Sequence, residues 1–276
     1  MKSKIAIVGC GWLGLPLAIS LLKKGNTIIG TTTSPQKLPQ LDEVGIVSKL
    51  WSFSQDINED SLSFLEDIDI LVLNIPPREK GSCCQYSQEI MKVCATLSQR
   101  TKVIFISTTS VYSDSLEIAT EEYQFTETDL LKETVLAEVN CRKILGERLT
   151  ILRLAGLIGE SRHPIKTLAG REDVQHGNSA INLIHQKDAI GLIESIINKN
   201  CWGEIVNGCY PAHPTKETYY QKAANFFQLP GPKFLQNREI KKIVSSDKSQ
   251  RILSYEYIYS VDDFNLLTLN KNSLSQ

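Results

Sequence analysis

The stretch that decides the fold reads IAIVGCGWLGLPLA, residues 5–18. An apolar run suited to a β-strand meets three glycines spaced G-x-G-x-x-G, Gly9, Gly11 and Gly14, and a periodic helix predicted to reach about Lys24 follows at once. The first glycine permits a sharp turn, the second lets the backbone approach a pyrophosphate, and the third lets the helix pack against the strand. The helix N-terminus presents N–H groups and a positive dipole end to an anion. This order predicts a dinucleotide site.

Composition narrows the class of protein. The 276 residues, 42% of them hydrophobic, suit one α/β domain with an elaborated end. A formal net charge of -1 gives no broad attraction to nucleic acid or to an anionic membrane surface. We therefore expect small-molecule partners or a second copy of the chain, and neither nucleic acid nor membrane.

The cysteines and the apolar runs bear on the compartment. Seven cysteines are scattered, odd in number and free of C-x-x-C spacing, so neither a disulfide framework nor a zinc site is predicted and a reducing compartment fits. The chain begins without a charged n-region and cleavable apolar segment, and no apolar run reaches the roughly 18 residues that span a bilayer. These features predict a cytoplasmic protein.

A second strand is predicted at residues 27–31, and it runs into TTTSPQK, residues 31–37. An acidic residue at the end of this strand would bind the adenosine ribose of NAD. No acid occurs before Asp42, whereas hydroxyls and a lysine are at hand, so NADP is favoured and NAD stays possible. The alternative, which holds with either cofactor, is that Ser34-Pro35 only starts the next helix. The cofactor candidates here are Thr32, Thr33, Ser34 and Lys37.

Further strands are predicted at 46–53, 70–75 and 103–107, with a helix at 85–98 before the last of them. This alternation predicts a parallel sheet. The carboxyl ends of such strands face the ligand, so the end of 70–75 should border the adenosine or ribose. The alternative is a plain proline stop at PPR, residues 76–78. The candidates are Asn74, Ile75 and Pro76.

The run STTSVY, residues 107–112, resembles the end of the fifth strand of the extended short-chain dehydrogenase/reductases, the class of nucleotide-sugar epimerases and dehydratases. The resemblance implies that Thr108 is the catalytic hydroxyl. LAE at 136–138 is similar to the helix that carries the family's tyrosine. ILRLAGLIG at 151–159 is similar to the sixth strand and the loop beside the nicotinamide. NLIHQKDA at 182–189 is similar to the segment that closes the substrate pocket.

One branch matches more closely. The set GxGWLGxPLA, STTSVY, RLAGLIG followed by RHP at 162–164, NLIH, and NGCYPAHP at 207–214 is similar to the bacterial YeeZ-like proteins, atypical members described as NAD(P)-binding. The resemblance spans about residues 4–257. It implies one extended α/β domain, a Rossmann-type doubly wound parallel sheet of about seven strands, with residues 1–160 mainly dinucleotide-binding. Residues 161–276 would mainly form a small C-terminal substrate lobe, with some segments returning to the core. It allows a homodimer and adds these cofactor contacts: Trp12, Leu13, Ser107, Leu154, Ala155 and Gly156.

The usual acid/base pair of the resembled family is missing. There a lysine four residues after a tyrosine lowers the pKa of that tyrosine. The pair would fall within residues 130–145, yet no tyrosine lies between Tyr123 and Tyr210, and none of the nine tyrosines is followed by a lysine at that spacing. If Ala137-Glu138 marks the family's position, residues such as Leu130 and Thr134 occupy the two slots.

Three alternatives follow. Thr108 works with another acid, for which Tyr112, Tyr123, Lys132 and Glu133 lie in the right part of the chain. The simpler interpretation of each is a packed ring or a solvated charge. Second, the protein binds the dinucleotide without turnover, as a sensor or scaffold. Third, the chemistry uses C-terminal histidines.

The histidines divide by context. His163 follows Arg162 in a loop where the guanidinium would match a phosphate or carboxylate, and a plain surface loop is the alternative. His185, at the end of an apolar strand, suits a hydrogen-bonded structural residue near the pocket more than a general base. His213 lies between prolines and His176 in a polar loop, and no pair has ligand spacing, so no metal is predicted. The substrate candidates are Arg162, His163 and His185.

The sequence thus predicts an NAD(P)-dependent reductase, epimerase or dehydratase with a non-standard active site and, by analogy alone, a nucleotide-sugar substrate. The alternative is a non-catalytic dinucleotide-binding protein. Near the C-terminus, Tyr255, Tyr257 and Tyr259 alternate along a predicted β-like edge.

Overall fold

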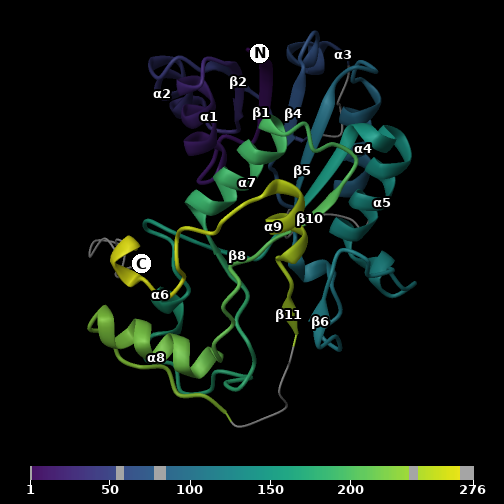
Figure 1. Cartoon of the computed structure of the whole chain (residues 1–276). Coiled ribbons are helices and arrows are strands. Elements are labelled where there is room, and N and C mark those ends of the chain that lie inside the picture. Colours follow the sequence, from purple (N-terminus) through teal and green to yellow (C-terminus); the bar gives the residue numbers. More distant parts are fainter. Residues whose placement is uncertain (1, 54–58, 78–84, 236–241, 268–276) are drawn as a thin grey trace. The chain divides into compact units, whose positions relative to one another are not determined.

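A computed structural model describes residues 2–53, 59–77, 85–235 and 242–267 (Figure 1). The chain divides into two compact units. The first comprises residues 1–111, 124–153 and 193–206, and the second comprises residues 112–123, 154–192 and 207–276. Two segments therefore depart from a division into an N-terminal core and a C-terminal lobe. Residues 112–123 belong to the second unit, and residues 193–206 belong to the first.

A seven-stranded sheet forms around the N-terminal strand. The strand order is β10-β7-β5-β4-β1-β2-β3, and β1 pairs in parallel with both β2 and β4, as β2 does with β3 and β4 with β5. The order grows outward from β1 in both directions, so the predicted Rossmann-type doubly wound sheet is confirmed. Its strands are β1 Lys4–Val8, β2 Thr27–Thr32, β3 Val47–Leu50, β4 Ile70–Leu73, β5 Lys102–Thr108, β7 Leu149–Leu154 and β10 Ile205–Gly208.

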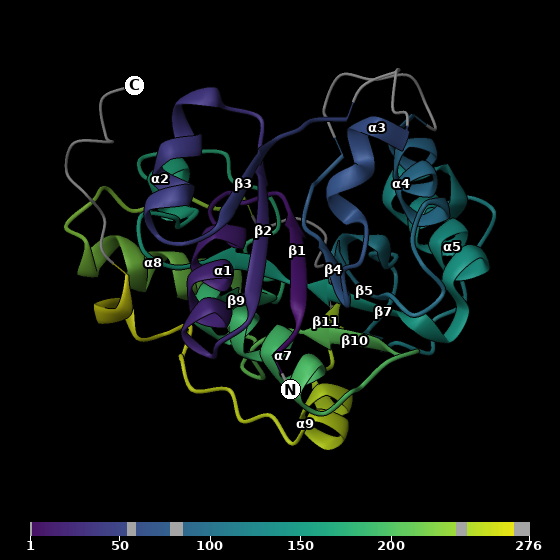
Figure 2. The same cartoon turned by 90° about the horizontal axis from the view of Figure 1, so that it is seen from above.

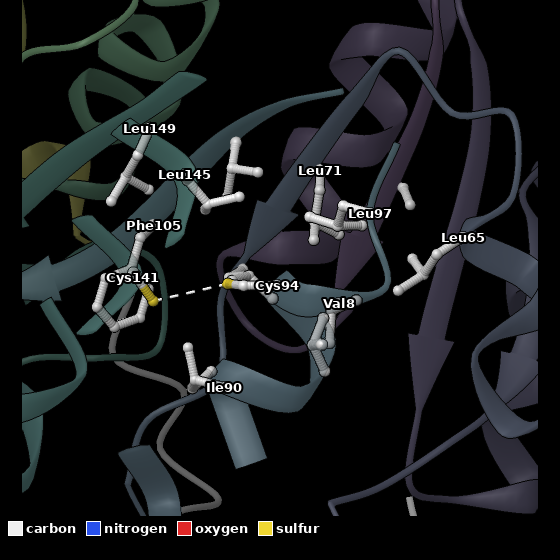
Figure 3. Close-up of a cluster of buried hydrophobic side chains, with 14 of the residues drawn as sticks. Val8, Leu65, Leu71, Ile90, Cys94, Leu97, Phe105, Cys141, Leu145 and Leu149 are labelled. Carbon is white, nitrogen blue, oxygen red and sulfur yellow. Dashed lines mark hydrogen bonds between the residues drawn. The ribbon is translucent and has the colours of Figure 1, made fainter. Parts of the chain in front are cut away.

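Helices with apolar stripes cover the strands of the first unit. In α1, Leu17, Ala18 and Leu21 are buried at helical spacing. Helices α4 and α5 lie next to each other (Figure 2) and share one buried cluster with β4 and β5, which includes Leu71 and Phe105 (Figure 3). The helices are α1 Gly14–Lys23, α2 Leu38–Glu43, α3 Glu59–Leu62, α4 Gln85–Ala95, α5 Glu133–Leu145 and, partly in this unit, α7 Gln186–Asn198.

The second unit has an aromatic core of its own. Strand β8 (Gly156–Ile158) pairs in parallel with β9 (Leu183–His185), and β6 (Ile118–Ala119) with β11 (Ile243–Val244). Helix α8 (Lys216–Phe226) is capped at its N-terminus by Thr215, whose side chain accepts from the Thr218 amide. The remaining helices are α6 Ile165–Leu168 and α9 Asp247–Leu253. Buried residues from several of these elements form the core: Ile158, Ile165, Ile181, Leu183, Tyr219, Tyr220, Ala223, Ala224, Val261, Phe264 and Leu267.

The predicted β-like edge at residues 255–259 is wrong, because this segment is not a strand. Its donors go to the buried carboxylate of Asp188, which accepts from the Tyr255 hydroxyl at 2.9 Å and from the Ile258 and Tyr259 amides at 3.1 Å each. A side chain replaces the neighbouring strand as acceptor.

Other predicted elements differ mainly in extent. The run 151–159 contains two strands, because β7 ends at Leu154 and β8 begins at Gly156, whose amide donates to the Asn182 carbonyl. The strand predicted at 46–53 is limited to Val47–Leu50. Residues 54–58, Arg78, 239–241 and the tail from Asn270 lie outside the described residues. In the part of the chain that is described, no helix combines the length and apolarity needed to cross a membrane.

Candidate functional site

In the glycine turn between β1 and α1, two of the three glycines have no room for a side chain, and the third has room for one. Gly9 has φ +106°, and a Cβ there would overlap the Asn74 carbonyl oxygen. A Cβ on Gly14 would overlap the Gly9 carbonyl oxygen. At Gly11, by contrast, a Cβ would meet nothing within 4 Å. Contacts within the protein therefore demand glycine at positions 9 and 14, but not at position 11.

Side chains from two neighbouring strands hold this turn. The Gly9 amide donates to Thr31 Oγ1 at 3.0 Å, and the Cys10 amide donates to the Thr31 carbonyl at 2.8 Å. Asn74 Nδ2 donates to the Gly9 carbonyl at 3.0 Å. The predicted candidate Asn74 is thus brought to the glycine turn, followed by half-buried Ile75 and exposed Pro76. Within the turn, Trp12 is half-buried and Leu13 is buried.

Thr31 was not among the predicted residues, although its position was informative. It is the last residue but one of β2, which pairs with β1, so its side chain reaches the turn that follows β1. The neighbouring hydroxyls of Thr32, Thr33 and Ser34 are instead the ones predicted to contact the cofactor.

The end of β2 carries no acidic group. Thr32 Oγ1 accepts from the Ser34 amide at 3.2 Å, and the Ser34 hydroxyl donates to Gln36 at 2.8 Å, so both hydroxyls form local turn contacts. Thr33 and Lys37 are exposed. The structure thus leaves these two predicted side chains at the surface beside the strand end.

A buried charged cluster fixes the end of β5. Ser107 Oγ donates to Glu138 Oε1 at 2.5 Å, and Arg153 Nη2 donates to Glu138 Oε2 at 2.6 Å, with Arg153 Nε 3.1 Å from each carboxylate oxygen. The three residues are 6%, 2% and 1% exposed, respectively. The Arg153 guanidinium also lies 5.0 Å from the Phe125 ring centroid. Hydrogen bonds of this quality are what a buried ion pair needs to offset the loss of hydration.

Thr108 follows this cluster directly. Its side chain is half-buried, and its Oγ1 accepts from the Ser110 amide at 3.2 Å. Lys132 Nζ donates to the carbonyls of Ser110 and Val111 at 3.4 and 3.2 Å and pairs with Asp129 at 3.3 Å. The exposed ammonium is therefore solvated and also contacts the turn after β5.

Glu133 also has a structural contact rather than a purely solvated charge, because its carboxylate accepts from the Ser87 amide at 3.1 Å. Helix α5 begins at Glu133, so Leu130 lies in a preceding 3-10 turn, 39% exposed, while Thr134 is half-buried on the helix. Neither Leu130 nor Thr134, which are predicted to occupy the tyrosine and lysine slots, carries a titratable group.

Several predicted residues belong to the second unit. Tyr112 is 1% exposed, and its hydroxyl donates to Asn207 Oδ1 at 2.7 Å. Its ring meets Tyr123 edge-on, with centroids 5.8 Å apart. Leu154 and Ala155 are buried, whereas Gly156 is exposed at the start of β8. The structure therefore assigns the Tyr112 hydroxyl to an internal hydrogen bond of this unit.

The alternative that His163 lies in a plain surface loop is wrong, because its side chain is buried. The side chain is 4% exposed, with Nε2 2.9 Å from the Tyr219 hydroxyl and Nδ1 accepting from the Ile165 amide at 3.2 Å. Burial lowers the pKa of His163 to about 4, so the ring is neutral at pH 7. An anionic ligand would have to displace one of these bonds, while Arg162 beside it is exposed.

His185 is buried at the end of β9, where its Nδ1 accepts from the Lys187 amide at 3.2 Å. Its ring stacks on Tyr259 with centroids 5.0 Å apart. Burial, and to a lesser extent the charge of Lys187, lowers the pKa of His185. These contacts agree with a structural residue. In the described residues, no group of three His, Cys, Asp or Glu side chains has an arrangement suited to a metal ion.

Solved structures share this fold over nearly the whole chain. UDP-glucuronic acid 4-epimerase from Bacillus cereus, in complex with NAD, has a TM-score of 0.75 at 20% identity, with 94% of this chain and 95% of that chain covered. A short-chain dehydrogenase/reductase superfamily protein from Agrobacterium tumefaciens with bound NAD has a TM-score of 0.75 at 12% identity, covering 94% of each chain. The fold is thus that of the epimerases and short-chain dehydrogenases/reductases.

Sequence likeness identifies the branch. The chain is 34% identical to protein YeeZ of Escherichia coli (strain K12) over 268 residues, which covers 93% of this chain and 96% of that protein. The chain belongs to the YeeZ family. A functionally unknown conserved protein from Silicibacter pomeroyi has a TM-score of 0.73 at 20% identity, covering 96% of this chain and 97% of that chain. No family model matches the chain.

Proposed function

We propose that this protein binds a nicotinamide dinucleotide at the glycine turn. The observation that carries the proposal is the open space at Gly11 between two glycines whose surroundings are filled. A side chain at Gly11 would fit the protein, so the need for glycine there points to a ligand that approaches the backbone. The N-terminus of α1 begins three residues later and favours the phosphates of such a ligand.

Within this proposal, NADP is preferred over NAD. The end of β2 lacks the carboxylate that would bind a free ribose hydroxyl and repel a 2′-phosphate. Exposed Thr33 and Lys37 are available to receive that phosphate instead. Replacing Lys37 with alanine should therefore narrow the difference between the Kd for NADPH and the Kd for NADH, with Lys49→Ala, also on an exposed side chain, as the matched control.

The reaction we propose is of the oxidoreductase type, on a small molecule, with nucleotide sugars as the first substrate class to try. A bound nicotinamide dinucleotide supplies hydride transfer. Thr108 would hydrogen-bond the reacting oxygen, and the Ser107, Glu138 and Arg153 cluster holds the strand end from which it projects. Support for the substrate class comes from the fold, since one structure of this fold is a UDP-glucuronic acid epimerase.

A second candidate is a dinucleotide-binding sensor or scaffold without turnover. The observation that favours it is the absence of titratable groups at Leu130 and Thr134, together with the engagement of the Tyr112 hydroxyl by Asn207. Both candidates require the same cofactor site.

Calorimetric titration of the cofactor-free protein tests the proposal. We expect saturable binding of NADPH, weaker binding of NADH, and loss of both in Gly11→Val, whose far-UV circular dichroism should match the parent. A nucleotide sugar that tightens NADPH binding would favour the enzyme, because two sites would then be coupled. Absence of binding by either dinucleotide would refute the proposed cofactor site.

A further inference from the structure

Two thiols meet in the core of the first unit, between α4 and α5. The sulfur atoms of Cys94 and Cys141 lie 3.7 Å apart, within hydrogen-bonding distance for thiols, as the dashed line in Figure 3 marks. The two residues are 47 positions apart in the chain and 1% and 0% exposed. Their contact is therefore a product of helix packing and not of local sequence.

The helix pair that carries these thiols is fixed by further bonds. The Ser87 amide of α4 donates to Glu133 of α5 at 3.1 Å, and Asn140 Nδ2 donates to Ser87 Oγ at 2.9 Å. A disulfide joins its sulfurs at about 2.05 Å, so these two must approach by roughly 1.7 Å. The sulfurs already face each other across one interface, which keeps the required movement small.

The surroundings decide how the pair can react. Ile90, Leu97 and Leu145 belong to the same buried cluster (Figure 3). The hydrogen bond with Cys94, followed by burial, raises the pKa of Cys141, so this thiol stays protonated in the closed structure. Cys94 precedes the last residue of α4, and Ala95 is exposed. Local opening of this helix end is the expected route by which an oxidant reaches the thiols.

We propose that Cys94 and Cys141 form a reversible redox pair, which a small disulfide such as oxidised glutathione converts into an intramolecular disulfide between α4 and α5. One protein thiolate attacks the small disulfide, forms a mixed disulfide and expels one small thiol. The second protein thiolate then attacks the protein sulfur of that mixed disulfide and expels the second small thiol. The protein loses two hydrogens in all, and the small disulfide gains them as two thiols.

The disulfide would close a loop of the chain from Cys94 to Cys141, which includes β5 and the hydroxyl of Thr108. Oxidation would therefore link the two neighbouring helices that pack against β4 and β5, which in the chain precede and follow the strand that carries the candidate hydroxyls. The proposed redox pair does not depend on cofactor binding, so an experiment can refute either proposal without refuting the other.

Peptide mapping of the full chain tests the redox pair. Cys83 and Cys84 lie outside the described residues, so both are first replaced with serine to remove competing thiols. After incubation with oxidised glutathione and alkylation, we expect a cross-linked Cys94–Cys141 peptide two hydrogens lighter than the reduced pair and released by dithiothreitol. Cys141→Ala should abolish the cross-link, whereas Cys201→Ala, a half-buried thiol of the same unit, should keep it.

A thermal unfolding scan provides the second measurement. The oxidised protein should unfold at a higher temperature than the reduced protein, and dithiothreitol should reverse the change, while the Cys141→Ala variant should not respond. The proposal is overturned if both thiols remain alkylatable after oxidation in sub-denaturing urea, which promotes local opening. It is equally overturned if cross-links form at random among the remaining cysteines or if oxidation leaves the unfolding temperature unchanged.

Discussion

The buried charges at the end of β5 make a quantitative prediction about stability. Glu138→Gln keeps the shape of the side chain but removes the charge that faces Arg153, which is 1% exposed. The Glu138 carboxylate accepts from Ser107 at 2.5 Å and from Arg153 at 2.6 and 3.1 Å. Loss of one partner leaves an uncompensated charge in the interior, so we expect the free energy of unfolding to fall by about 3–5 kcal/mol.

The matched control removes the whole cluster. In a triple variant with Ser107→Ala, Glu138→Met and Arg153→Met, no hydroxyl or charge of the cluster remains without a partner. Apolar groups of similar volume often replace a buried ion pair without loss. We expect the triple variant to regain stability to within about 1 kcal/mol of the parent.

Urea unfolding followed by tryptophan fluorescence measures both variants. All three tryptophans, Trp12, Trp51 and Trp202, belong to the first unit, so their emission reports on the unit that holds the cluster. The reasoning is refuted if Glu138→Gln unfolds within about 0.5 kcal/mol of the parent, the range typical of surface changes, or if the triple variant is as unstable as the single variant.

Three further predictions follow from the site residues. Gly14→Ala should lower the free energy of unfolding by about 1–3 kcal/mol through overlap with the Gly9 carbonyl, whereas Gly11→Ala should not lower it. Equal urea midpoints for the two variants would contradict this contrast. Thr108→Val should abolish any turnover found with a nucleotide sugar and leave the Kd for NADPH close to that of the parent, because Thr108 is not among the residues proposed to contact the dinucleotide. Activity equal to the parent would exclude the proposed role. Because the folded-state pKa of His163 is lowered to about 4, the unfolded chain binds the proton more readily. Stability should therefore be full above about pH 6.5 and lost as the pH falls toward 4, by about 2 kcal/mol at pH 5. In His163→Gln this part of the pH dependence of urea unfolding should vanish, and an unchanged slope between pH 7 and pH 5 would be inconsistent with a buried neutral ring.

The sequence was most informative where structure depends on neighbours in the chain. The turn at Gly9 and Gly14, the alternating strands and helices, and the apolar strand Ile70–Leu73 follow from local spacing and composition. These features predicted a dinucleotide-binding parallel sheet, and the family resemblance implied that it is doubly wound with about seven strands. The placement of Asn74 at the carboxyl end of this strand also followed, but its bond to the Gly9 carbonyl was not predicted, because the expected position of Asn74 was beside the adenosine or ribose.

The rest depends on contacts between distant residues. Glu138 reaches Ser107 from 31 positions away, and His163 reaches Tyr219 from 56 positions away. No local pattern distinguishes a loop histidine that faces solvent from one that enters an aromatic core. For the same reason an alternating run of tyrosines resembled a strand, although its hydrogen-bond acceptor is a side chain contributed by another part of the chain.

That acceptor, Asp188, holds the segment of residues 255–259 in place without a neighbouring strand. The segment is held much as a bound peptide is held by a receptor, through two main-chain amides and one hydroxyl that converge on a single carboxylate. Gly191 on the same helix leaves the space that the Tyr255 ring occupies. A chain that ended before Tyr255 would leave a buried negative charge without these donors. The last described residues are therefore part of the structural framework of the second unit, and shortening the chain there would destabilise that unit from within.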